Sequence, residues 1–106
     1  MRLRAIAVAL ACLACSAPAF AFTGAELIQG DRSFGVGYVF GVVEYQTGVL
    51  DRDNPNFMKV RNCVVGAKMN AETLYDVAVQ YFHTHPKTMT EPAYGGIIKA
   101  IKEMCE

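Results

Sequence analysis

The chain has 106 residues, 53% of them hydrophobic, and its ten Lys and Arg side chains balance ten Asp and Glu side chains. This length fits a single domain. The lack of a basic excess argues against nucleic acid as a partner, because binding to phosphates requires clustered Lys and Arg.

Residues 1–21 have the three parts of a secretory signal peptide. Two arginines precede an apolar run over residues 5–15, and Ala19-Phe20-Ala21 is a small-residue cleavage motif. The run is shorter than the roughly 18–20 apolar residues that span a bilayer, so we expect cleavage after Ala21 and no membrane span. Residues 22–106 would then form one exported domain that keeps eight basic residues and all ten acidic ones.

The four cysteines divide between the leader and the exported domain. Cys12 and Cys15 would matter only in a lipoprotein signal, an alternative that is weakened because neither has a leucine three positions earlier. Cys63 and Cys105 are expected to form a disulfide in an oxidising compartment. This bridge would close a loop of about 43 residues and stabilise the fold by about 4 kcal/mol in the chain-entropy model. A zinc site is the competing interpretation, but the histidines lack the paired ligand spacing.

The exported domain is predicted to open with a short helix. Thr23 and Glu26 have the spacing of a capping box, and Gly30-Asp31 would end the helix. Ser33 could cap a second helix over residues 34–50, whose apolar residues recur at intervals of three and four. Its expected buried stripe is Phe34, Tyr38, Val42, Tyr45 and Val49.

Three glycines lie inside this second helix, and each costs up to about 1 kcal/mol relative to alanine. Gly37 and Gly41 are four residues apart on one face, so we expect a neighbouring helix to approach closely there. A β-strand over residues 36–43 is the alternative, because its aromatic and β-branched content also suits a strand.

The segment 51–62 is predicted to be a loop, because it is polar and contains proline and several turn-forming residues. Loops of about 12 residues without structure of their own are uncommon in compact domains and are often functional. The plain alternative is a slack connection tied down at Cys63.

Two further helices complete the prediction. Asn70 would cap a helix over residues 71–83 that Pro86 stops, and Glu91-Pro92 would open the last helix. The expected buried residues are Leu74, Val77, Ala78, Tyr81 and Phe82 in the third helix, and Tyr94, Ile97, Ile98, Ile101 and Cys105 in the last. The predicted fold class is all-α, a small four-helix domain stapled by one disulfide.

No set of catalytic side chains is expected. His83 and His85 lie near a helix end, where bonding to the last carbonyls suits them better than metal binding. Ser33 lacks a glycine-framed elbow, and Asp51 and Asp53 lie in a solvated turn, which does not suit acid–base catalysis. We therefore expect no enzyme activity, metal or cofactor, and infer that the domain works by binding.

Several short motifs follow the leader in a characteristic order. They are Gly24-Ala25-Glu26-Leu27-Ile28, then Gly35-Val36-Gly37-Tyr38-Val39-Phe40-Gly41, then Cys63 with Leu74, Val77, Tyr81-Phe82 and Pro86, and finally Ala93, Ile97, Ile98 and Cys105. This order resembles the Rap/Tai family of type VI secretion immunity proteins over nearly all of residues 22–106. Gly35 stands where the family has a cysteine, and that cysteine's expected partner near residues 29–31 is also missing, as if one whole disulfide were lost.

The resemblance implies a periplasmic protein that binds a peptidoglycan amidase toxin and blocks its active-site cleft. A rigid scaffold that presents a loop loses little entropy on binding, so we take the loop over residues 51–62 as the inserted segment. The expected contacts are Asp51, Arg52, Asp53, Asn54, Phe57 and Met58. Phe57 would be the apolar anchor. A homodimer stays open, because related immunity proteins can use dimer surfaces.

Two other functions stay open. One is a periplasmic acid-stress chaperone, which would need many protonating groups, whereas ten acidic residues and two histidines are an ordinary supply. The other is a small exported protein that uses the same fold to bind an unrelated ligand.

Overall fold

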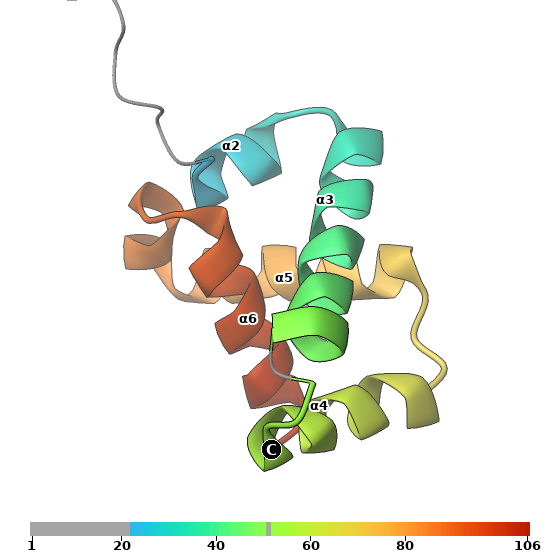
Figure 1. Cartoon of the computed structure of the whole chain (residues 1–106). Coiled ribbons are helices and arrows are strands. Elements are labelled where there is room, and N and C mark those ends of the chain that lie inside the picture. The colour runs from blue at the N-terminus through green and yellow to red at the C-terminus, as the bar shows by residue number, and fades with distance from the viewer. Residues whose placement is uncertain (1–21, 51) are drawn as a thin grey trace, which may run out of the picture.

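The computed structural model describes residues 22–50 and 52–106, which are mostly helical (Figure 1). Its elements are α2 (Gly24–Gln29), α3 (Arg32–Tyr45), the π-helical turn η1 (Gln46–Leu50), α4 (Pro55–Gly66), α5 (Ala71–Thr84), the 3₁₀ turn η2 (Pro86–Thr90) and α6 (Ala93–Met104). This described part has five α-helices, one more than predicted, and no strand beyond an isolated bridge between Thr23 and Pro92. The predicted leader lies outside it.

The capping box predicted for the first helix is present in α2. The Glu26 backbone N–H donates to Thr23 Oγ1 at 3.2 Å, and the Thr23 N–H donates to the Glu26 carboxylate at 3.4 Å. The chain in front of α2 is also fixed to α6, because the Ala93 N–H donates to the Phe22 carbonyl at 2.7 Å. The first described residues are thus held against the last helix.

Residues 36–43 belong to helix α3, so the helix prediction is confirmed and the strand alternative is wrong. The helix buries a different face from the one predicted. Its cap is Asp31, whose side chain accepts from the Phe34 N–H at 3.0 Å, and not Ser33. The buried residues are Gly35, Val39, Val42 and Val43, whereas the predicted Phe34, Tyr45 and Val49 are exposed and Tyr38 is half-buried. The prediction was wrong because apolar residues lie on nearly every side of α3, so their spacing could not select one face.

The close approach predicted at Gly37 and Gly41 occurs instead at Gly35. A Cβ added to Gly35 would lie 2.6 Å from Cε2 of Tyr75, so α5 can pack there only against glycine. A Cβ added to Gly37 or Gly41 would meet nothing within 4 Å. No helix of the described chain uses that pair.

The predicted loop over residues 51–62 was wrong, because most of that segment belongs to α4. Pro55 occupies the first turn, where its missing N–H costs nothing. Val60 is buried and Cys63 and Val64 are half-buried, which is the spacing of a helix face. The proline and the polar residues around it concealed this pattern.

Helices α5 and α6 lie close to their predicted positions. Asn70 caps α5 by accepting from the Thr73 N–H at 2.8 Å, and Pro86 opens η2 directly after the helix end. The buried residues are Leu74, Tyr75, Ala78 and Phe82 in α5, and Ala93, Gly96, Ile97, Ala100 and Ile101 in α6. Five residues predicted to be buried are only half-buried: Val77, Tyr81, Tyr94, Ile98 and Cys105.

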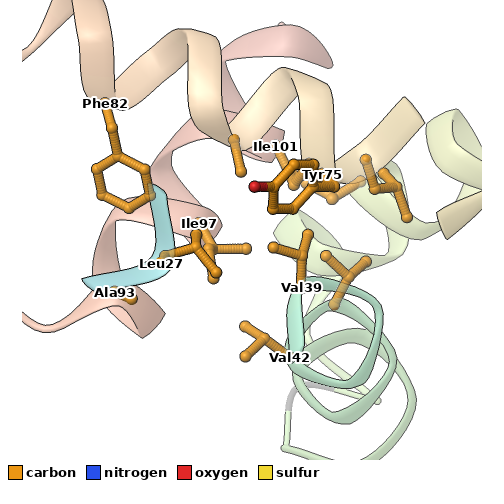
Figure 2. Close-up of a cluster of buried hydrophobic side chains, with 12 residues drawn as sticks. Leu27, Val39, Val42, Tyr75, Phe82, Ala93, Ile97 and Ile101 are labelled. Atoms are coloured by element: carbon orange, nitrogen blue, oxygen red, sulfur yellow. The ribbon is translucent and has the colours of Figure 1, made fainter. Parts of the chain in front are cut away.

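The core lies where α3, α5 and α6 meet, and α2 covers one end of it (Figure 2). Phe82, Ile97 and Val39 contribute from these three helices, and Leu27 from α2; each is at most 1% exposed. Burial of such a side chain stabilises the fold by roughly 1.5–3 kcal/mol.

The predicted pair Cys63 and Cys105 is confirmed, with the two sulfur atoms at disulfide-bonding distance and the Cα atoms 5.9 Å apart. The bridge joins α4 to the end of α6, and the C-terminus lies beside α4 in Figure 1. Among the α4 side chains that the structure describes, Val60 alone is buried. The disulfide is therefore a main attachment of α4 to the rest of the fold.

Candidate functional site

An open groove of about 770 Å³ lies between the second half of α3, the η1 turn and α4. We call it the α3–α4 groove. Residues from α3 and η1 form one wall, and residues from α4 and the chain after it form the other. Its principal lining residues are Phe40, Gly41, Glu44, Tyr45, Gly48, Val49, Arg61, Val64, Val65 and Lys68.

Large apolar side chains are exposed along both walls of the groove. Tyr45 is 50% exposed and Val49 is 62% exposed on one wall, and Val65 is 68% exposed on the other. Contiguous exposed apolar surface is uncommon on soluble proteins and marks sites of interaction. The groove is thus the surface of this domain best suited to bind a partner.

The two walls of the groove differ in charge. Arg61 and Lys68 lie on the α4 wall, and Glu44 lies on the α3 wall. The sequence has no acidic residue between positions 54 and 70, so the charged residues of that stretch, Lys59, Arg61 and Lys68, are all basic. Within the described ranges, neither Arg61 nor Lys68 forms an ion pair. Both charges are available to an incoming group.

Arg32 shows the opposite situation at the start of α3. Its guanidinium lies 3.1 Å from a Glu72 carboxylate oxygen and 3.3 Å from one of Asp76, and it lies over the ring of Tyr75. The hydrogen bonds to these two carboxylates raise the pKa of Arg32. One guanidinium faces two carboxylates, so this exposed cluster keeps a net negative charge and has no free cation to attract an acidic partner.

The structure brings only some of the predicted contact residues together. Arg52 and Met58 join Arg61, Asn62 and Val65 around a second hollow of about 240 Å³. Asp53 and Asn54 belong to the turn that precedes α4. Asp51 and the side chain of Phe57 lie outside the described residues. Because both hollows share Arg61 and Val65, they form one continuous surface.

Most of the residues that form the groove were not predicted from the sequence as site residues. The predicted stripe places Tyr45 and Val49 on the buried side of one straight helix. No site was predicted at Phe40 or Val65. A usable indication was present in the sequence, because the stretch from α3 into η1 has more apolar residues than one buried face can hold.

His85 ends α5 in the manner predicted for a helix-terminal histidine. Its Nδ1 lies 2.9 Å from the Tyr81 carbonyl oxygen, and its ring stacks on the Tyr81 ring with centroids 4.0 Å apart. A search of the described residues finds no group of three or more His, Cys, Asp or Glu side chains placed to hold a metal ion. In the same residues, no helix is long and apolar enough to cross a membrane.

No family model, curated protein or solved structure matches the chain.

Proposed function

We propose that this protein is a periplasmic immunity protein that binds and inhibits a peptidoglycan amidase delivered by type VI secretion. The observation that supports the proposal best is the continuous apolar and basic surface over α3, η1 and α4. The motif order, which resembles the Rap/Tai family, supports an amidase toxin as the class of partner.

The attachment of α4 favours tight binding. A surface that is already ordered loses little conformational entropy when a partner docks. The bridge from Cys63 to Cys105 fixes α4 against the C-terminal helix in an oxidising compartment. The exposed side chains of Tyr45, Met58 and Val65 then supply apolar anchors of the kind that dominate interface energies.

The direct test is inhibition of peptidoglycan cleavage by candidate amidases in the presence of the oxidised protein. Val65→Asp places a charge where the groove and the smaller hollow meet, and we expect it to weaken inhibition at least about tenfold. Phe34→Asp is the matched control, because Phe34 is 58% exposed in the first turn of α3 and lines neither hollow.

Three outcomes have distinct meanings. Inhibition that Val65→Asp weakens and Phe34→Asp leaves intact supports the proposal. Equal loss in both variants, with native circular dichroism, would show that the surface is wrongly placed. No inhibition of any amidase, together with suppression of client aggregation at about pH 3, would favour the acid-stress chaperone.

A further inference from the structure

We infer that the α3–α4 groove binds a helix of the partner protein, with apolar residues on one face and acidic residues along one flank. The inference names the partner segment recognised at the proposed surface, and in that respect it rests on the proposed function. The shape of the groove, its glycines and its charges each support it.

The shape of the groove requires a convex occupant. A second copy of this chain placed groove against groove would leave the hollow unfilled, and packing voids forfeit most of the contact energy. The wall from Phe40 to Val49 is about 14 Å long at 1.5 Å per helical residue, which matches roughly two and a half turns of an added helix.

The walls favour a helix over an extended strand. Both walls are built largely from helical segments, whose backbone groups are bonded within the same element. A strand laid between them would bury its own N–H and C=O groups without partners. A helix satisfies its backbone internally and needs only side-chain contacts, which is the usual mode of binding in an apolar groove.

Glycines on the groove wall allow such a helix to approach closely. Gly41 and Gly48 both line the groove, and a Cβ added to either would meet nothing within 4 Å. A helical glycine costs up to about 1 kcal/mol relative to alanine. No contact within the described chain offsets this cost, whereas a partner backbone lying over Gly41 would.

The charges define which flank of the added helix is acidic. Arg61 and Lys68 line the α4 wall, so carboxylates on the flank facing α4 would be attracted, while Glu44 favours a neutral or basic residue on the other flank. Lys68 has a backbone φ of 54°, in the left-handed region where glycine is the unstrained choice. A lysine side chain is thus presented to the groove despite a backbone cost.

The test uses two labelled amphipathic peptides of about 15 residues, long enough to populate a helix. Both carry Leu and Ala on one face; one carries Glu on the polar flank and the other carries Lys. Titrating oxidised protein and following fluorescence anisotropy, we expect the Glu peptide to bind at least about tenfold more tightly. Equal binding of both peptides, or binding of neither, would overturn the inference.

Groove variants locate the bound peptide. Gly41→Leu fills the hollow and should weaken binding of the Glu peptide at least about tenfold. Gly95→Leu is the matched control, because Gly95 is an exposed helical glycine with open space around it on α6. The double variant Arg61→Glu/Lys68→Glu should reverse the preference toward the Lys peptide. Equal loss in Gly41→Leu and Gly95→Leu would contradict binding in the groove.

Measurements with the amidase separate this inference from the proposed function. Selective binding of the Glu peptide without inhibition of any amidase would keep the groove inference and remove the amidase as partner. Inhibition that Gly41→Leu leaves intact would keep the amidase and remove the groove. A concentration-dependent dimer in sedimentation that Gly41→Leu abolishes would assign the groove to a second copy and overturn the inference.

Discussion

Adjacent glycines in α6 illustrate how strongly the fold depends on single side chains. A Cβ added to Gly96 would lie 2.6 Å from Cζ of Phe82, a fully buried core ring, whereas a Cβ added to Gly95 meets nothing within 4 Å. The two glycines have the same intrinsic helix propensity, yet the packing requires glycine at position 96 and does not require it at position 95.

Gly96→Ala is expected to lower the free energy of unfolding by about 1–3 kcal/mol, because Phe82 must shift within a packed core. Gly95→Ala is the matched control and should raise it by up to about 1 kcal/mol through helix propensity alone. Urea denaturation of the oxidised variants measures both. Similar values for the two variants would mean that α6 does not pack on Phe82 as described.

Tyr38 provides a test of packing at alkaline pH. Its ring contacts those of Phe22 and Phe34, and partial burial raises the pKa of its hydroxyl above 10.0. As pH rises, the unfolded chain therefore loses the Tyr38 proton before the folded protein does. The stability that the neutral Tyr38 hydroxyl contributes is complete below about pH 10 and is lost as pH rises through the folded-state pKa. We expect Tyr38→Phe to lose less stability than the parent between about pH 9 and pH 11, measured by urea midpoints.

At the scale of whole elements, the sequence was most informative where capping residues and a one-sided apolar pattern agreed. Thr23 and Asn70 correctly located the starts of α2 and α5. Helix α3 was predicted, but with the wrong face buried, because it is apolar on nearly every side. Its buried face is the one that brings Gly35 against Tyr75 and places Val39 in the core. That approach depends on tertiary packing, which no local pattern contains.

The candidate site was the least predictable part, and α4 explains why. Its apolar pattern is short, and its start at Pro55 follows a run of turn-forming residues that masks it. The groove also requires η1, where the backbone leaves α-helical geometry just as the apolar residues continue to Val49 and Leu50. Sequence periodicity assumes one regular helix, so it assigned Val49 to the core.

The disulfide should stabilise the attachment of α4 to the fold more than the attachment of any other helix. Reduction, or the double variant Cys63→Ser/Cys105→Ser, is expected to lower the free energy of unfolding by about 4 kcal/mol, because the unfolded chain gains loop entropy. Urea denaturation with and without reductant measures this change. The double variant should match the reduced parent, and an unchanged midpoint on reduction would contradict this role of the bridge.

At the scale of the whole molecule, the charges are unevenly arranged although the chain is formally neutral. The segment from Asn54 to Asn70 carries only basic charges, whereas Glu72 and Asp76 on α5 are paired with Arg32. An acidic partner would therefore be steered toward α4 and away from the carboxylates of α5.

This arrangement predicts a salt-dependent association with the amidase of the proposed function. The association rate should fall about tenfold or more between low and physiological ionic strength, because salt screens exposed charges. Arg61→Glu/Lys68→Glu should flatten this dependence while leaving the urea midpoint nearly unchanged. Stopped-flow measurements at several salt concentrations test it, and a steep dependence that survives the double variant would place the steering charges elsewhere.

The bridge from Cys63 to Cys105 also determines how the domain would respond to mechanical force. Tension applied through Phe22 and Glu106 would pass from Cys63 to Cys105 through the sulfur link, so the backbone of α5 and α6 would not be stretched. The bridge would withhold the chain between the two cysteines from extension, a sequence separation of 42, and so shorten the stretched chain by about 140 Å at roughly 3.4 Å per residue. When an oxidised domain anchored at both ends is unfolded by force, about half of the contour length of residues 22–106 would be extended. Reduction of the bridge would release the other half.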